Sequence, residues 1–125
     1  MSRRSELYRE AIAVIELRYA EEDLSLHTVS RTIATSRRQL QRAFAEAGGT
    51  SFRRELQRVR MQRAAALLRD GALSVQAVAA AVGYRQAAQF AKAFRRHYGA
   101  PPSAFRGNGS GSRPGARSGG ERLAA

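Results

Sequence analysis

The stretch VGYRQAAQFAKAFRRHYG, residues 82–99, decides the fold of this chain. Its aromatic residues Phe90, Phe94 and Tyr98 recur every four positions, which is the spacing of one face of an α-helix. The pair Gly83-Tyr84 forms a turn before this helix, and the prolines that follow end it because proline has no amide to continue the helical bonding. The stretch predicts the second helix of a helix-turn-helix unit, with its aromatic residues facing a core.

An earlier stretch repeats this unit. LSLHTVSRTIAT, residues 24–35, aligns with LSVQAVAAAVGY, residues 73–84, at a constant offset of 49. One residue is added in the second turn, and the offset is 50 from there to a glycine in each copy. The matched pairs are Leu24 and Leu73, Ser25 and Ser74, Val29 and Val78, Ile33 and Val82, Leu40 and Phe90, Arg42 and Lys92, Phe44 and Phe94, and Gly49 and Gly99. The repeat predicts two copies of helix, turn and helix, with Ala34-Thr35 in the first turn.

Serines mark the expected helix starts of the first copy. Ser5 is expected to cap a leading helix with a recurring apolar face, and Ser25 opens a short helix. Ser36 and Gln39 have the spacing of a capping box, in which the Ser36 side chain accepts from the Gln39 backbone amide and the Gln39 side chain reaches back. The helix from Ser36 has Leu40 and Phe44 on its inner face and ends at Gly48-Gly49.

A long helix is predicted between the two copies. Thr50 or Ser51 caps this helix. It runs from Phe52 to about Arg69, and Gly71 ends it. About 18 residues rising roughly 1.5 Å each make a rod of roughly 27 Å. Its expected inner stripe is Leu56, Val59, Arg63, Ala64, Leu67 and Leu68. The predicted fold class is therefore all-α, with two helix-turn-helix subdomains joined by a long connecting helix.

The expected division of the chain follows from these elements. The first subdomain is 5–49, the connecting helix 50–71, the second subdomain 72–106, and 107–125 a flexible tail rich in Gly, Ser and Arg. The tail carries +2 of the net charge, which leaves most of the positive charge on the folded part.

Composition indicates a polyanionic partner. The 125 residues hold 22 Lys and Arg against 10 Asp and Glu, a net charge of +12, and Lys92 is the only lysine. Arginine suits phosphates and the O6/N7 edge of guanine. The chain has no cysteine, and no apolar run approaches the roughly 20 residues that span a bilayer, so a cytoplasmic protein without disulfides is expected.

The second helix of each copy is expected to turn a polar face outward. With Leu40 and Phe44 inside, the outer face of the first copy offers donors and acceptors for base edges in a major groove. With the aromatic stripe inside, the outer face of the second copy offers fewer donors and acceptors. Ala88 on that face can only touch a thymine methyl or let the backbone approach. The expected base-reading residues are Arg38, Gln39, Gln41, Arg42, Arg85, Ala88, Gln89 and Lys92. The expected phosphate contacts are Ser36, Arg37, Gln86 and Arg96.

Together these motifs resemble the DNA-binding domain of AraC/XylS-type transcriptional regulators, over about residues 7–106. The resemblance is carried by Val78-Ala79, Gly83-Tyr84, Phe90 to Phe94, Tyr98-Gly99 and Pro102 to Arg106, and in the first copy by Ser36, Leu40, Arg42 and Phe44. Arg60-Met61 to Leu67-Leu68 resembles the connecting helix of the family. Ser30 and Ala34 depart from the Ala and Gly that are usual there, and Ala88 from a commonly polar residue.

The resemblance implies about seven helices and two recognition helices in successive segments of the major groove, so that one chain reads an asymmetric site. It also implies RNA polymerase as a partner of an activator, with repression by occlusion left open. No segment suggests a pocket for a small-molecule effector. Because Met1 lies just before the leading helix, the chain is either a single-domain regulator or the DNA-binding piece of a longer protein.

Other functions were weighed against this interpretation. His27 and His97 have no ligand at metal spacing, no cofactor motif occurs, and no nucleophile or phosphate-loop motif indicates an enzyme. The acidic residues near the leading helix are interpreted as a solvated face rather than a catalytic pair. Two alternatives stay open: a sequence-tolerant DNA-binding protein of the nucleoid type, which would bind any duplex alike, and a protein-interaction module whose basic surface meets an acidic partner.

Overall fold

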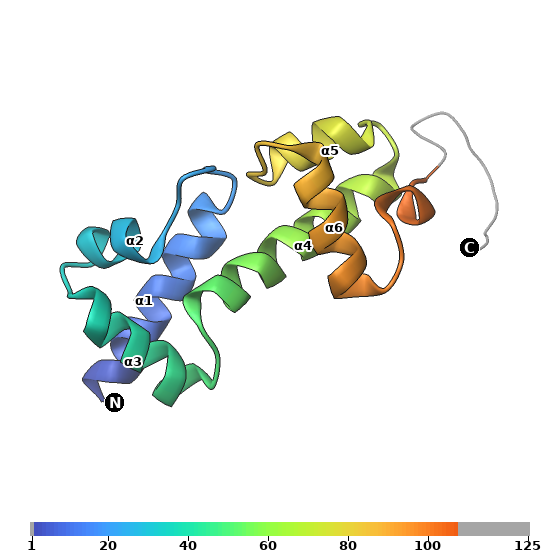
Figure 1. Ribbon diagram of the computed structural model, residues 1–125. Helices are drawn as coiled ribbons and strands as arrows, with labels where there is room; N and C mark the ends of the chain where they lie inside the picture. The colour runs from blue at the N-terminus through green and yellow to red at the C-terminus, as the bar shows by residue number, and fades with distance from the viewer. Residues whose placement is uncertain (1, 108–125) are drawn as a thin grey trace. The chain divides into compact units, whose positions relative to one another are not determined.

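The computed structural model describes residues 2–107, and over that range the chain consists of helices and connecting turns without a strand (Figure 1). The prediction of an all-α fold with about seven helices is confirmed, since six α-helices and one 3₁₀ helix lie in this range. They are α1 (Arg3–Arg18), α2 (Leu26–Thr32), α3 (Arg37–Gly48), α4 (Phe52–Asp70), α5 (Val75–Ala81), α6 (Ala87–Tyr98) and the 3₁₀ helix η1 (Pro102–Phe105). None of these helices is both long enough and apolar enough to cross a membrane.

Two compact units divide the chain, and the division falls inside α4, after Arg60. The first half of α4 contributes Leu56 and Val59 to one core, and the second half lies in the other unit. The expected tail lies outside the described residues from position 108 onward. Gly107, its first residue, is held in place, because its amide donates a hydrogen bond of 2.8 Å to the Leu68 carbonyl oxygen.

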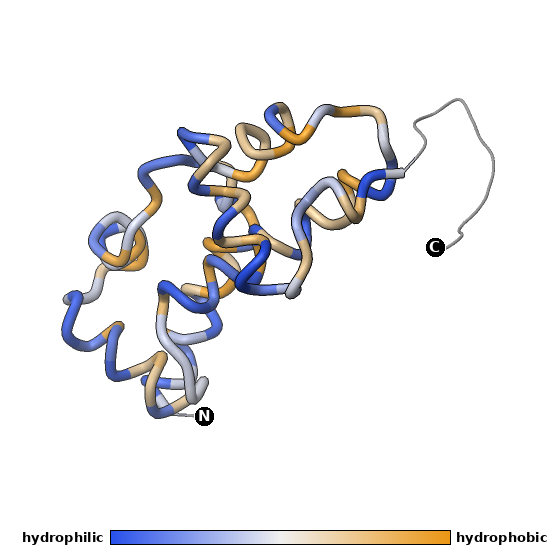
Figure 2. The backbone as a smooth tube through the Cα atoms, turned by 45° about the vertical axis from the view of Figure 1, so that its right-hand side comes forward, coloured by the Kyte–Doolittle hydropathy of each residue, from blue (hydrophilic) through white to orange (hydrophobic). Residues whose placement is uncertain are grey.

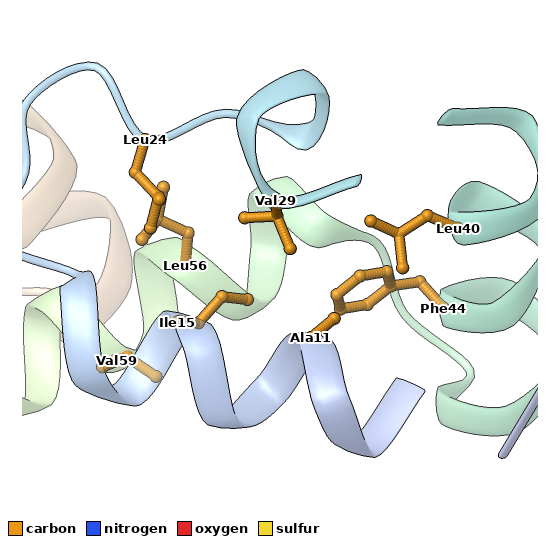
Figure 3. Packing of buried hydrophobic residues seen from close by; sticks show 8 residues of the cluster. All are labelled: Ala11, Ile15, Leu24, Val29, Leu40, Phe44, Leu56 and Val59. Carbon is orange, nitrogen blue, oxygen red and sulfur yellow. The ribbon is translucent and has the colours of Figure 1, made fainter. Parts of the chain in front are cut away.

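The core of the first unit is built where α1, α2, α3 and α4 meet. Leu7, Ala11 and Ile15 recur at helical spacing along α1 and are buried. Figure 3 shows Ala11 and Ile15 among the side chains that converge in this core, which are Ala11, Ile15, Leu24, Val29, Leu40, Phe44, Leu56 and Val59. The Phe44 ring meets the rings of Tyr8 and Phe52 edge-on, at 5.4 and 6.0 Å between centroids. The core fixes which face of α3 is left for solvent.

The second unit is organised around the aromatic residues of the opening stretch. Phe90 and Phe94 are fully buried, and their ring centroids lie 5.7 Å apart. Phe94 continues the stack to Tyr98 at 4.8 Å and to Phe105 at 4.9 Å, so that η1 packs onto α6. The predicted inner stripe of Phe90, Phe94 and Tyr98 is confirmed, with Tyr98 half-buried at the end of the helix.

The predicted stripe of α4 is wrong at Arg63, which is exposed. The predicted Ala64 and Leu68 are buried in the second half of the helix, together with Met61 and Ala65, which were not predicted. A single stripe was extrapolated from Leu56 and Val59, but each unit buries its own face of α4, so the stripe does not run straight through. Arg60 is buried as well, at 9% exposure, and no apolar pattern pointed to it.

The leading helix also begins earlier than expected. Its N-cap is Ser2, whose hydroxyl oxygen accepts from the Ser5 backbone amide at 3.1 Å, so Ser5 lies within α1 rather than capping it. Both serines are good caps, and an apolar pattern that starts at Leu7 does not distinguish them. Figure 2 shows that hydrophilic and hydrophobic residues are both spread along the chain of helices.

Candidate DNA interface

The first helix and the start of the turn have the same local geometry in the two helix-turn-helix units. Ser25 and Ser74 cap α2 and α5, each accepting from the backbone amide three residues on. The helices end at Ile33 and Val82 with nearly equal backbone angles, φ −101° and ψ 14° against φ −105° and ψ 16°. The predicted repeat is therefore confirmed at the level of backbone conformation.

The two turns close with equivalent hydrogen bonds. The Thr35 amide donates to the Ser30 carbonyl oxygen and the Tyr84 amide to the Ala79 carbonyl oxygen, both at 2.9 Å. The residue before each has a positive φ, 58° at Ala34 and 93° at Gly83. This 6→1 bond with a left-handed residue is the Schellman ending of a helix, and it sets the direction in which the next helix leaves.

The second helices are also matched, since α3 and α6 each have 12 residues and end at a glycine with positive φ. Ser36 caps α3, as expected, by accepting from the Gln39 amide at 3.1 Å. The other half of the predicted capping box is wrong: the Gln39 side-chain oxygen accepts from the Thr35 hydroxyl at 2.9 Å. A hydroxyl donor in the turn competes with the Ser36 amide for that oxygen, and the sequence rule does not consider it.

The outer face of α3 is polar and carries positive charge. Leu40, Ala43 and Phe44 are buried on the inner side. All six predicted site residues of this helix and its cap are exposed: Ser36, Arg37, Arg38, Gln39, Gln41 and Arg42. Within residues 2–107, no acidic side chain forms an ion pair with Arg37, Arg38 or Arg42. Their guanidinium groups are therefore available to an external anion.

The outer face of α6 is likewise polar and exposed. The buried residues are Phe90, Ala93 and Phe94. The predicted site residues of this unit are all exposed: Arg85, Gln86, Ala88, Gln89, Lys92 and Arg96. Gln86 occupies the N-cap position but makes no side-chain cap bond, so the first turn of α6 differs from the capped first turn of α3. Unsatisfied amides at a helix N-terminus favour anions.

Other arginines of the first unit are engaged within the protein. Arg3 pairs with Glu6 and Glu10, and Arg4 pairs with Glu46 on α3. The hydrogen bond with Arg18 lowers the pKa of Glu21, and the same bond raises the pKa of Arg18. In these pairs, acidic side chains of α1, of α3 and of the turn after α1 neutralise neighbouring arginines. The unpaired positive charge of α3 lies in its first two turns.

A cavity of about 360 Å³ lies beside α3 in the first unit. It is lined by Leu26, Gln41, Phe44, Ala45, Thr50, Ser51, Phe52 and Arg53. Gln41, an expected base-reading residue, borders this hollow. Arg53 lines the same cavity and is exposed.

The sequence analysis did not single out Arg53 or Thr35 as functional residues. Arg53 follows the Ser51 cap of α4, where the Arg54 amide donates to the Ser51 hydroxyl oxygen at 3.1 Å. An Arg-Arg pair in the first turn of a helix could have indicated an exposed cationic site, because Arg53 and Arg54 follow the Ser51 cap after only one residue and are both exposed. Thr35 gave no signal, since its contact with Gln39 depends on the turn conformation.

The two histidines lie on the surface of the protein. His27 and His97 are both exposed, and the His97 ring contacts Tyr98 edge-on at 4.7 Å. In the described part of the chain, no three side chains of His, Cys, Asp or Glu are grouped so that they could hold a metal ion.

The geometry defines a double helix-turn-helix domain, and comparison with known proteins agrees. A family model described as a helix-turn-helix domain matches residues 29–108. An uncharacterized HTH-type transcriptional regulator of Haemophilus influenzae is 36% identical over 90 residues, which cover 72% of this chain and 30% of that protein. The chain spans less than a third of the length of the curated relatives it matches.

Solved structures share the fold over nearly the whole described range. The C-terminal domain of AraT, a response regulator from Geobacillus stearothermophilus, has a TM-score of 0.82 at 30% identity, covering 90% of this chain and 95% of that one. A transcriptional regulator from Chromobacterium violaceum, described as containing an AraC-type DNA-binding domain, has a TM-score of 0.74 at 28% identity, covering 81% of this chain and 89% of that one. The DNA-binding domain of AdpA, solved with a target DNA, has a TM-score of 0.73 at 28% identity, covering 79% and 88%.

This chain belongs to the AraC-type helix-turn-helix family of DNA-binding transcriptional regulators. The family assignment inferred from the motifs of the second copy is thereby confirmed. The relatives are named as HTH-type transcriptional regulators.

Proposed function

We propose that the chain is a sequence-specific regulator that reads an asymmetric site in double-stranded DNA as one polypeptide, with α3 and α6 in successive segments of the major groove. The observation that carries this proposal is the matched geometry of the two units, in which turns closed by equivalent hydrogen bonds lead into two exposed polar helix faces. Binding by charge alone requires no such matching.

The proposed base contacts come from both helices. On α3, Arg42 and Arg38 have the fork geometry that pairs with the O6 and N7 atoms of guanine, and Gln39 and Gln41 contribute carboxamides. On α6, Lys92 and Gln89 read bases, assisted by Arg85, while Ala88 packs against a thymine methyl. The second half-site is therefore expected to tolerate more sequences than the first.

Phosphate contacts position the two helices. Ser36 and Arg37 lie at the start of α3, and Gln86 and Arg96 serve α6, where the uncapped first turn favours an anion. We add Arg53, because it lies beside Gln41 at the edge of the α3 face. These contacts hold the register and supply most of the salt-sensitive affinity.

Activation through contact with RNA polymerase, without a small-molecule effector bound to this domain, completes the proposal; occlusion of a promoter by the bound protein would give repression instead.

The test is selection of bound duplexes from a random pool, followed by competition binding with two matched variants. Arg42→Ala is expected to weaken operator binding by about 1–3 kcal/mol and to relax selectivity at one position. Lys92→Ala, at the matching place on α6, is expected to lose less selectivity. Equal losses on operator and random DNA for Arg42→Ala would contradict base reading by α3, and selection without any consensus would favour a sequence-tolerant DNA-binding protein.

A further inference from the structure

The bond between Thr35 and Gln39 determines which end of the Gln39 carboxamide is free. Thr35 is held in the turn because its amide donates to the Ser30 carbonyl oxygen at 2.9 Å. Its hydroxyl donates to Oε1 of Gln39 at 2.9 Å. Gln39 is the third residue of α3 and is exposed, and its backbone amide is taken by the Ser36 cap. The side-chain oxygen is thus directed back to the turn, and the amino group points away from it.

A carboxamide has one acceptor oxygen and one amino group with two donors. The bidentate contact with adenine needs both ends, since the oxygen accepts from N6 and the amino group donates to N7. Guanine presents two acceptors, O6 and N7, to the major groove. With its oxygen directed to Thr35 and its amino group directed outward, Gln39 presents donors that match guanine, while the amino group of adenine would face another donor.

We propose that Thr35 is a positioning residue that makes Gln39 select guanine over adenine at the base pair it meets. This inference rests on the proposed function, because it assumes that α3 enters the major groove. It adds to that function a base preference that the residue type alone does not give, since glutamine is ordinarily associated with adenine.

The second unit contains the natural comparison. Gln89 is the third residue of α6 and corresponds to Gln39 at the offset of 50. Tyr84 stands where Thr35 stands, and its ring packs against Phe90 at 5.6 Å between centroids. Within residues 2–107, the Gln89 side chain has no hydrogen-bond partner. Both ends of its carboxamide are available, so Gln89 is expected to prefer adenine in the second half-site.

The experiment compares base preferences of the full chain and three variants on duplexes selected from a random pool. Gln39→Ala identifies the base pair that Gln39 meets, because preference is lost there alone. The wild-type protein is expected to show guanine at that position. Thr35→Val removes the hydroxyl while keeping a β-branched residue, and it is expected to lower the guanine-to-adenine affinity ratio there by about tenfold, within the range of one bidentate contact. Thr35→Ser keeps the hydroxyl and is expected to keep guanine.

The outcomes separate this inference from the proposed function. If the wild-type protein selects a defined site but has adenine at the Gln39 position, or if Thr35→Val leaves the ratio unchanged, the inference is overturned and the proposed function stands. If Gln39→Ala alters no position, the inference is likewise overturned. If the wild-type protein selects no consensus sequence, both the inference and the proposed function are overturned. The preference at the Gln89 position, unchanged in Thr35→Val, and an unchanged thermal unfolding curve show that the variant is folded.

Discussion

At the residue scale, Ala34 is the clearest departure from backbone preference. Among residues 2–107 it is the one non-glycine residue with a positive φ, at 58°. In this conformation the Cβ of an L-residue approaches the following carbonyl oxygen, which costs roughly 1–2 kcal/mol relative to glycine. The equivalent position of the second unit is Gly83, which adopts a φ of 93° without that cost. The first turn is therefore strained at a place where the second is relaxed.

We expect Ala34→Gly to raise the free energy of unfolding of the first unit by about 1 kcal/mol, because the relief of strain exceeds the added flexibility of glycine in the unfolded chain. Gly83→Ala is the matched reverse change and is expected to destabilise by a similar amount. Urea unfolding followed by circular dichroism measures both. A loss of stability in Ala34→Gly, or no change in either variant, would show that the positive φ carries no strain.

Single residues were also where prediction from sequence was limited. The exposure of Arg38, Arg42 and Lys92 could be predicted, because buried partners at helical spacing fix the opposite face. The hydrogen bond of the Gln39 side chain could not be predicted, because it depends on the Thr35 hydroxyl, which the backbone of the turn places. The cap of α1 was assigned to Ser5 rather than Ser2 for a related reason: local spacing allowed both.

At the element scale, α4 joins the two cores and also closes the end of α1. The Arg60 guanidinium donates from Nε to the Tyr19 carbonyl oxygen at 2.8 Å and from Nη2 to the Glu21 carbonyl oxygen at 2.7 Å. Tyr19 is the C-cap of α1, so Arg60 bonds one carbonyl group at the helix end, where helices leave carbonyl groups without intrahelical partners, and a second one in the turn that follows. A cation near a helix C-terminus also interacts favourably with the helix dipole.

We predict that Arg60→Met lowers the free energy of unfolding by about 2 kcal/mol, since the two hydrogen bonds from a charged donor to the Tyr19 and Glu21 carbonyl groups are lost. Methionine retains much of the apolar stem, which limits the loss from packing. Arg54→Met, an exposed change on the same helix, serves as control and is expected to stay within about 0.5 kcal/mol. Chemical denaturation compares the two. Equal stability of both variants would show that Arg60 does not stabilise the end of α1.

Elements themselves could largely be predicted from the sequence. The repeat, the caps Ser25, Ser36 and Ser74, and the glycines that end α3 and α6 depend on short-range rules and are confirmed. The inward face of α4 could not be predicted beyond Val59, because a helix shared by two units has no single period. Burial of Arg60 depends on carbonyl groups about 40 residues away, which no local pattern contains.

At the scale of the whole molecule, the proposed mode of binding predicts a site without twofold symmetry. One chain with two different reading faces requires two different half-sites in a fixed order. We expect inversion of one half-site within a selected operator to weaken binding at least tenfold, with one chain bound per duplex. Competition binding measures the loss, and sedimentation measures the stoichiometry. An operator that tolerates the inversion, or that holds two chains, would contradict reading of the site by a single polypeptide.

The duplicated unit also affects how such a protein can evolve. In a symmetric homodimer, every codon change appears twice in the complex, so a new contact alters both halves of the operator together. Here the two recognition helices are encoded separately, and their sequences have already diverged, with arginines on α3 where α6 carries alanines. On the proposed mode of binding, mutation can retune one half of a promoter site while the other half continues to anchor the protein.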